Sequence, residues 1–163
     1  MRKRQPDTEA QRLVQMYADL ILRLGYTYLK STHDAEDVCQ NVLIKLLQTE
    51  RAFENAEHER AWIVRTTANA CKDVLRSRRR RTSVALDAVA EAAAPEVPDS
   101  AVLDAVMELP QPFREALHLH YYEGYTAREI ADMTDSTEDA VAARLSRGRK
   151  KLRALLEGAD DDR

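Results

Sequence analysis

The chain contains little glycine and few aromatic residues. Among its 163 residues there are four glycines, and aromatic residues account for 6% of the total. Alanine, leucine, arginine and glutamate are abundant instead. This composition predicts an all-α protein, and the length suits one domain or two small ones.

Cysteine is scarce as well, and long apolar runs are absent. Cys39 and Cys71 are too few, and too distant in sequence, for a disulfide framework or a four-ligand zinc site. Their apolar helical neighbours predict buried free thiols. The N-terminal residues MRKRQPDTEAQR have no apolar run behind their basic residues, so they do not form a signal peptide. Since there is no transmembrane segment either, we expect a cytoplasmic protein without membrane insertion.

Signals for catalysis and for metal binding are missing. The sequence has no glycine-rich phosphate loop and no nucleophile motif. His118 and His120 point to different faces of a helix, and we identify no histidine with a carboxylate or cysteine partner at ligand spacing. We therefore expect no enzymatic activity, no catalytic residue, no cofactor and no bound metal.

The charge is divided into opposed segments. The formal net charge is −3, but residues 72–81 form one basic block and the last helix forms another. Acidic residues concentrate in residues 87–104 and in residues 160–162. Because local charge governs phosphate binding, the acidic total does not exclude nucleic acid as a partner.

The segment from Tyr122 to Leu156 predicts two helices joined by a tight turn. Thr126 and Glu129 match a capping box, and Ser136 or Thr137 can cap the second helix. An apolar stripe that holds the second helix down, with cations over the rest of its surface, is typical of a helix-turn-helix. An isolated basic helix is as readily a solvated surface helix, but the capped partner favours nucleic-acid binding. The apolar residues are Ile130, Ala131, Met133, Val141, Leu145, Gly148, Leu152 and Leu155; the basic ones are Arg144, Arg147, Arg149, Lys150, Lys151 and Arg153.

Three helices are predicted in the N-terminal half. The first opens at a Thr8–Gln11 capping box, the second follows Ser31 and Thr32, and the third runs to about Arg80 after a polar stretch, residues 48–59. The residues expected to face inward are Leu13, Met16, Tyr17, Leu20, Ile21 and Leu24; Val38, Val42 and Leu46 with Leu43 and Leu47; and Trp62, Ile63, Thr66, Ala70 and Val74 with neighbouring apolar residues.

A linker separates this half from a second helical unit. From Thr82 to Pro98, alanines, prolines and acids replace the amphipathic pattern, with a helical turn around residues 86–89. A helix capped by Asp99 or Ser100 then ends at Leu109-Pro110. The next starts at Pro112, closes at Gly124, and has Phe113, Leu117 and Tyr121 on its core side. We therefore divide the chain into residues 1–81, a flexible linker at 82–98, residues 99–157 and an acidic tail at 158–163.

Both units resemble one family. DAEDVCQNVLIKLL, Asp34 to Leu47, resembles a helix of region 2 in bacterial sigma factors, and AWIVRTTANACKDVLRSRRRR, Ala61 to Arg81, resembles the promoter-reading helix after it. The C-terminal unit resembles region 4, from Leu109-Pro110 through Tyr121-Tyr122-Glu123-Gly124 to Leu145, Arg147 and Leu152. The chain is thus similar to an extracytoplasmic-function sigma factor, which lacks the N-terminal region and domain 3 of housekeeping sigma factors. The resemblance implies a sigma region 2 helical bundle and a region 4 helix-turn-helix.

The resemblance implies roles for both helices of region 2. The Asp34–Leu47 helix would dock on the β′ clamp helices of core RNA polymerase, although helix N-terminal chemistry also explains Asp34. The third helix, with residues 51–60 before it, would capture and open the −10 element: Asn69 can pair with a base edge and the cations with phosphates. A solvated Asn69 is the alternative, and Trp62 is expected in the core. The polymerase-binding positions are Asp34, Asp37, Gln40 and Asn41; the −10 positions are Arg65, Asn69, Lys72, Asp73 and Arg76.

The last helix resembles the reader of the −35 element, which lies in the major groove. The sequence departs from the family at Thr134-Asp135-Ser136 and at Ala142-Ala143, where a lysine and a serine are common. Asp135 tolerates the left-handed conformation of the turn, so the fold survives, but the usual contacts at 142 and 143 do not. Glu138 and Asp139 either accept from cytosine amino groups or favour the helix N-terminus. The −35 positions are Thr137, Glu138, Asp139, Arg144, Arg147, Arg149 and Lys150.

As a sigma factor, the protein would bind core RNA polymerase, through the β′ clamp helices and the β flap, and direct promoter-specific transcription initiation. Its other implied partners are promoter DNA and an anti-sigma factor. The main alternative is a helix-turn-helix transcriptional regulator that acts without being a polymerase subunit. That alternative explains the C-terminal half but leaves residues 34–81 without a purpose. A purely protein-binding helical adaptor is a further alternative, and the sequence favours it less.

Overall fold

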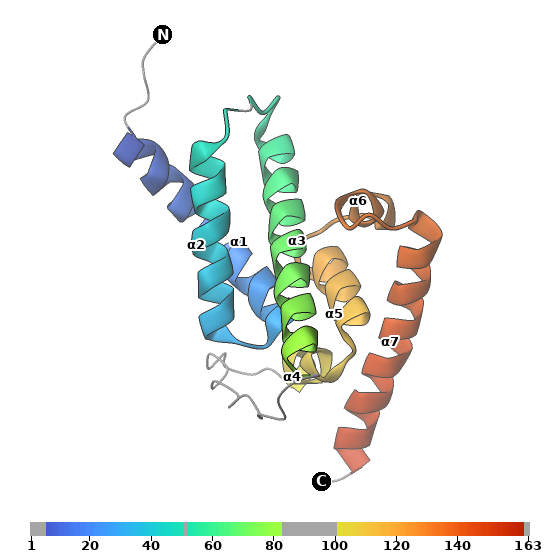
Figure 1. Ribbon diagram of the computed structural model, residues 1–163. Coiled ribbons are helices and arrows are strands. Elements are labelled where there is room, and N and C mark those ends of the chain that lie inside the picture. The colour runs from blue at the N-terminus through green and yellow to red at the C-terminus, as the bar shows by residue number, and fades with distance from the viewer. Residues whose placement is uncertain (1–5, 51, 83–100, 162–163) are drawn as a thin grey trace. The chain divides into compact units, whose positions relative to one another are not determined.

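The described part of the chain is helical. The computed structural model describes residues 6–50, 52–82 and 101–161, and within these ranges the regular elements are helices without any strand (Figure 1). They belong to two compact units, of which the first contains α1 to α3 and the second α4 to α7. The all-α prediction is therefore confirmed for these residues.

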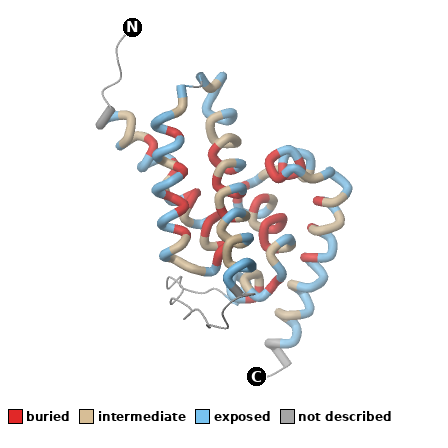
Figure 2. Tube along the Cα trace, in the orientation of Figure 1, coloured by how far each residue is buried: buried red, intermediate tan, exposed pale blue. Residues whose placement is uncertain are grey.

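The first unit is a bundle of three long helices, α1 (Pro6–Leu29), α2 (Thr32–Gln48) and α3 (Ala56–Thr82). Buried positions run along the facing sides of the helices, as the red segments in Figure 2 show. Burial of these apolar side chains removes them from water and provides the main stabilisation of the bundle. The most deeply buried residues are Ile21, Leu24, Tyr28, Val42, Ile63, Val64, Thr67 and Cys71.

Two details of the expected core were wrong. Met16 and Leu47 were expected to face inward, but they are 52% and 45% exposed. In α3, Ile63 and the neighbouring Val64, Ala68 and Cys71 are buried as expected, whereas Trp62 is half-buried. Trp62 lies beside the centre of the buried stripe, a step of one residue that an amphipathic pattern resolves poorly. Trp62 packs edge-to-face on Phe53, with ring centroids 5.8 Å apart.

The helix α1 lies close to α2 at Gly25. A Cβ atom at that position would lie 3.2 Å from the Cβ and 3.3 Å from the Cα of Ala35. Glycine therefore permits a backbone approach that a larger residue would obstruct. The nearby Cys39 and the more distant Cys71 are both buried free thiols, as predicted, and burial raises the pKa of Cys39.

The second unit contains α4 (Ala101–Glu108), α5 (Gln111–Leu117), a π-helical turn η1 (His118–Tyr122), α6 (Ala127–Met133) and α7 (Glu138–Asp161). The helix α5 begins one residue before Pro112, which lies in its first turn. The caps expected at Asp99 or Ser100 and the turn expected at residues 86–89 lie outside the described residues.

Local signals around the helix-turn-helix are confirmed. Thr126 and Glu129 form the complete capping box, and the Thr137 hydroxyl accepts a hydrogen bond from the Ala140 N–H at 3.1 Å. Gly124 and Asp135 have φ values of +80° and +53°, in the left-handed region. These residues end η1 and α6 and thereby direct the chain into the next helix.

One core residue of the second unit was predicted wrongly. Phe113, Leu117 and Tyr121 share a side of an ideal α-helix, yet Tyr121 is 60% exposed. The cause is η1, in which the wider π geometry shifts the helical register. Leu119 is completely buried there, whereas Tyr121 and Tyr122 lie at the surface.

Candidate functional site

The exposed side of α2 brings together three of the residues assigned to polymerase binding. Asp37, Gln40 and Asn41 are exposed and lie three and four positions apart, on one face of the helix. Ile44 and Leu47 continue this face and are 51% and 45% exposed. Ile44 and Leu47 lie four and seven positions after Gln40, a helical spacing from which the sequence could have placed them on this face. Together they form a polar patch with an apolar end, which suits contact with another protein.

Asp34 has a different environment from the other three. Its carboxylate forms an ion pair with the Arg78 guanidinium of α3, and Arg78 also donates to the Leu29 carbonyl at 2.9 Å. The Asp34 N–H donates to the Ser31 hydroxyl at 3.2 Å, which caps α2. Asp34 therefore joins the start of α2 to the end of α3.

The expectation that no histidine has a carboxylate partner was wrong. His33 Nε2 lies 3.6 Å from Asp37 Oδ2 at the start of α2, and His118 Nε2 lies 3.2 Å from Glu123 Oε1 in the second unit. Ligand atoms of His33, Asp34 and Asp37 all lie within 4.8 Å of one another. Arg78 forms an ion pair with Asp34, and His33 and Asp37 are exposed to solvent. We therefore interpret the cluster as part of the polar surface and not as a metal site.

The side of α3 away from the buried stripe carries the residues assigned to the −10 element. Arg65, Asn69, Asp73 and Arg76 are exposed, and Lys72 beside them is half-buried. Their spacing of three and four residues places them along one side of the helix. Asp73 accepts a hydrogen bond from Arg76, so its charge is compensated within the helix. The remaining face is basic with an amide near its middle.

A network of polar side chains joins α1 to the start of α3. Glu59 accepts hydrogen bonds from Tyr17 Oη at 2.5 Å and from Arg12 Nη2 at 3.2 Å, and Arg12 also pairs with Glu9. Burial alone would raise the pKa of Glu59, but these hydrogen bonds and the Arg12 charge outweigh it, so the pKa is lowered. Burial and the bond to Glu59 raise the pKa of Tyr17. Sequence reasoning missed this network because its partners lie more than 40 positions apart.

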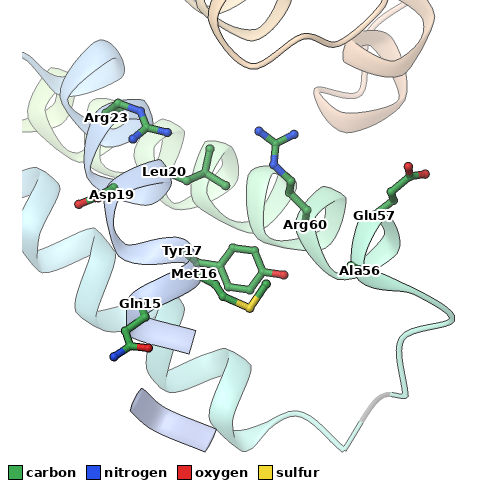
Figure 3. A pocket seen from close by; sticks show the side chains of 9 residues that line it. All are labelled: Gln15, Met16, Tyr17, Asp19, Leu20, Arg23, Ala56, Glu57 and Arg60. Carbon is green, nitrogen blue, oxygen red and sulfur yellow. The ribbon is translucent and has the colours of Figure 1, made fainter. Parts of the chain in front are cut away.

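An open groove of about 490 Å³ lies beside this network, between α1 and the start of α3. Figure 3 shows Met16 and Leu20 on the α1 side, with Glu57 and Arg60 on the α3 side. The groove is next to residues 51–60, the segment assigned to base capture, of which Arg51 lies outside the described residues.

In the second unit, α7 presents its basic side to solvent. Arg147, Arg149, Lys150, Lys151 and Arg153 are exposed, while Val141 and Leu145 are buried beneath them. Arg144 is half-buried and donates to the Ser136 hydroxyl at 3.0 Å, which ties the helix to the preceding turn. The acidic Glu138 and Asp139 occupy the first turn of α7, where the helix dipole favours them. The N-terminus of α7 is thus acidic, its N-cap is Thr137, and its central part is basic.

Contacts with α5 and η1 hold this basic helix. A Cβ at Gly148 would lie 3.3 Å from Leu117 Cδ1, so glycine permits close packing of α7 on α5. The Lys151 ammonium lies 5.7 Å from the centre of the Phe113 ring, and Arg149 donates to Tyr121 Oη at 2.9 Å. The helix is therefore held at Gly148 and at the basic residues Arg149 and Lys151 that follow it.

Sequence reasoning also missed a buried arginine in α5 of this unit. Arg114 is 6% exposed and donates to the Leu109 carbonyl at 2.9 Å, and burial lowers its pKa. Arginine is usually placed at the surface, so no pattern in the sequence suggested this position. Its hydrogen bond stabilises the connection between α4 and α5.

Family models match both units. The model for sigma-70 region 2 matches residues 13–81, and that for sigma-70 region 4 matches residues 99–152. The described residues contain no helix with the length and apolar character needed to cross a membrane.

Relatives and solved structures agree with the family models. The extracytoplasmic-function RNA polymerase sigma factor SigE of Mycolicibacterium smegmatis is 31% identical over 155 residues, which cover 88% of this chain but 60% of SigE. The RNA polymerase sigma factor CarQ of Myxococcus xanthus is 31% identical over 129 residues, which cover 75% of this chain and 74% of CarQ.

Among solved structures, the sigma factor RpoE in complex with the anti-sigma factor NepR from Bartonella quintana has a similar fold. The TM-score is 0.74 at 21% identity, with 92% of this chain and 98% of that chain covered. CnrH, solved with the cytosolic domain of CnrY, has a TM-score of 0.61 at 20% identity, with 93% of this chain and 90% of that chain covered. The chain belongs to the sigma-70 family, as an extracytoplasmic-function RNA polymerase sigma factor.

Proposed function

We propose that this protein binds core RNA polymerase with α2, opens the −10 element with α3 and reads the −35 element with α7. The observation that carries the proposal is the order of three surfaces along one chain. A polar patch on α2 and a mainly basic side of α3 precede a capped, basic helix-turn-helix. The family models match the same two segments in that order.

Run-off transcription with purified core polymerase tests the proposal. The full chain should confer initiation at specific promoters of its own genome and should have no catalytic activity without the polymerase. If core polymerase with this protein initiates no better than core alone on every such promoter, the proposal fails. We further propose that the protein acts in the cytoplasm, where its polymerase partner is.

The polymerase contact is assigned to Asp37, Gln40 and Asn41. Replacing all three by alanine should weaken the complex with core polymerase and leave thermal melting nearly unchanged, because exposed residues contribute little to stability. Gln11, Gln15 and Asp19 provide a matched control, since they likewise place one carboxylate and two amides on exposed positions of α1. Equal loss of polymerase affinity in both triple variants would contradict the assignment.

The DNA contacts divide into positioning and reading. Charge removal at Arg147 or Lys150 should weaken promoter binding almost equally across sequences and lower the salt slope by about one per contact. Asn69→Ala should instead change the preference among −10 sequences, because an amide can pair with a base edge. A sequence-specific effect from the cations and none from Asn69 would reverse these roles.

We also propose that an anti-sigma factor regulates this protein and that the two DNA-binding units act together only on the polymerase. RpoE and CnrH were each solved with a protein partner, which supports the first point. Linking two weak sites raises affinity only when their spacing is compatible. The free protein should therefore bind promoters weakly, whereas the holoenzyme should depend on spacer length. Tight, specific binding by the free protein, indifferent to spacer length, would favour a regulator that acts without the polymerase.

A further inference from the structure

We propose that Tyr121 is a positioning residue of the DNA-binding surface, which holds the Arg149 guanidinium for contact with a backbone phosphate. The inference rests on the proposed function of α7, and it adds a residue from outside the helix-turn-helix. Tyr121 lies in η1, whereas α6 and α7 form the two helices of that motif.

The first observation is that Tyr121 is at the surface against the pattern of its helix. An uninterrupted α-helix would place it with Phe113 and Leu117, and burial of its ring would contribute to the core. Instead the π turn exposes 60% of the residue and places completely buried Leu119 in the core. π-Helical turns are rare, and they occur frequently at functional sites.

The second observation is the hydrogen bond that this exposure allows. Arg149 Nη1 donates to Tyr121 Oη at 2.9 Å, which is a normal length for such a bond. A guanidinium has further N–H groups in a fixed planar fork, so a bond through one nitrogen orients the rest. An arginine held in this way loses less side-chain freedom when it binds phosphate.

The third observation is that both residues are themselves held in place. Gly148, the residue before Arg149, packs against Leu117 closely enough that a Cβ would lie 3.3 Å from Leu117 Cδ1. The Tyr121 ring lies edge-on to His120, with centroids 4.7 Å apart, and His120 Nδ1 donates to the Tyr125 carbonyl at 2.8 Å. The tyrosine and the arginine thus meet across a packed helix pair.

The test uses holoenzyme reconstituted from core polymerase and the full chain, with binding to promoter DNA measured over a range of salt concentrations. Tyr121→Phe removes only the hydroxyl and should weaken binding about three-fold, the effect of losing one hydrogen bond. Arg149→Gln should weaken binding about ten-fold and lower the salt slope by about one. In the double variant, Tyr121→Phe should add no further loss, because its effect passes through Arg149.

Tyr122→Phe is the matched control. Tyr122 is 64% exposed and adjacent, but its ring stacks on His118, so the control removes a hydroxyl and keeps the Arg149 bond. It should bind promoter DNA like the wild type, and all variants should retain the wild-type melting temperature within a few degrees.

The outcomes separate this inference from the function on which it rests. If Arg149→Gln changes neither affinity nor salt slope, the phosphate role of Arg149 fails. If Arg149→Gln behaves as expected but Tyr121→Phe has no effect, or tightens binding, the positioning role is overturned. An equal loss from Tyr121→Phe with and without Arg149 would also overturn it, since the hydroxyl would then act by another route.

Discussion

The two units reach a stable helical fold by different means. The first consists of helices of 24, 17 and 27 residues, and two of its ion pairs, Arg12 with Glu59 and Asp34 with Arg78, join distant parts of the chain. The second has four elements of five to eight residues before its one long helix. Several polar contacts among its described residues are local, such as those of Arg144 with Ser136 and Arg114 with Leu109.

This difference determines where each unit is vulnerable. In the first, helix packing sets the position of the α2 and α3 surfaces, so a change at a helix-helix approach should matter most. In the second, Gly124, Asp135 and Thr137 set the direction of α7, so single turn residues should control the basic surface. Trp62, the only tryptophan of the chain, reports on the first unit, and hydrogen exchange of α5 to α7 reports on the second.

Gly25→Leu should have the largest effect and confirm that packing dominates the first unit. The Cβ of the new side chain would already lie 3.3 Å from the Cα of Ala35. Because this neighbour is a backbone atom, it can move less than the end of a side chain could. We expect a loss of about 3 kcal/mol in the free energy of unfolding, seen in denaturant melts followed by Trp62 fluorescence.

Gly158→Leu, in α7 of the second unit, is the control for this substitution. A Cβ at that position has no neighbour within 4 Å, so the stability of the second unit, measured by hydrogen exchange of α5 to α7, should change by less than about 0.5 kcal/mol. Similar losses at both glycines would mean that the intrinsic effect of leucine, and not the approach of α1 to α2, is responsible.

Gly124→Ala should have an intermediate effect and affect the second unit alone. Its φ of +80° is unfavourable for an alanine, and the cost is about 1–2 kcal/mol. Exchange protection in α5 to α7 should fall while Trp62 fluorescence melts stay unchanged. Gly124→Asn should lose less, because asparagine tolerates this conformation better. A change in Trp62 melting in either variant would contradict the separation between the units.

Glu59→Gln should have the smallest effect and show that ion pairs only supplement the packing of the first unit. At neutral pH the loss should be about 1 kcal/mol, because hydrogen bonds to Tyr17 and Arg12 are weakened. The folded pKa of Glu59 lies below the unfolded value, so its contribution is complete above the unfolded value and is lost as the pH falls through the folded pKa. Wild-type stability should therefore decline more steeply than that of the variant below about pH 4.3.

Glu57→Gln serves as the control, since Glu57 is exposed in the same turn of α3. It should keep the wild-type pH profile. A Glu59→Gln protein with the same acid response as the wild type would show that the network with Arg12 adds nothing to the stability of the bundle.

Sequence reasoning succeeded for several local determinants, although the capping box expected at Thr8 was wrong because α1 already includes Pro6. The caps at Thr126 and Thr137 and the left-handed residues Gly124 and Asp135 depend on side chains within four positions, and all were predicted. The family was also identified from its motifs, because two unrelated segments matched in one order. Exposure of Asn69 and Arg147 agrees with their assignment to DNA, which stays a prediction.

It failed where the determinants are distant or where the helix is irregular. The partners of Glu59 and Asp34 lie more than 40 residues away, so no periodicity reveals them. The burial of Arg114 depends on a carbonyl presented by the turn before α5. Tyr121 was misplaced because a π turn has no recognisable residue preference, and an error of one register step moves a side chain from core to surface.

The π turn has a consequence for how this protein can change by mutation. An extra residue within a helical turn separates positions 121 and 122 from the positions that maintain the core, which Leu117 and Leu119 occupy. We therefore expect substitution of Tyr121 to leave folding nearly unchanged. Evolution can thus alter DNA affinity at Tyr121 at little cost in stability, whereas a change at the buried Leu119 would destabilise the fold.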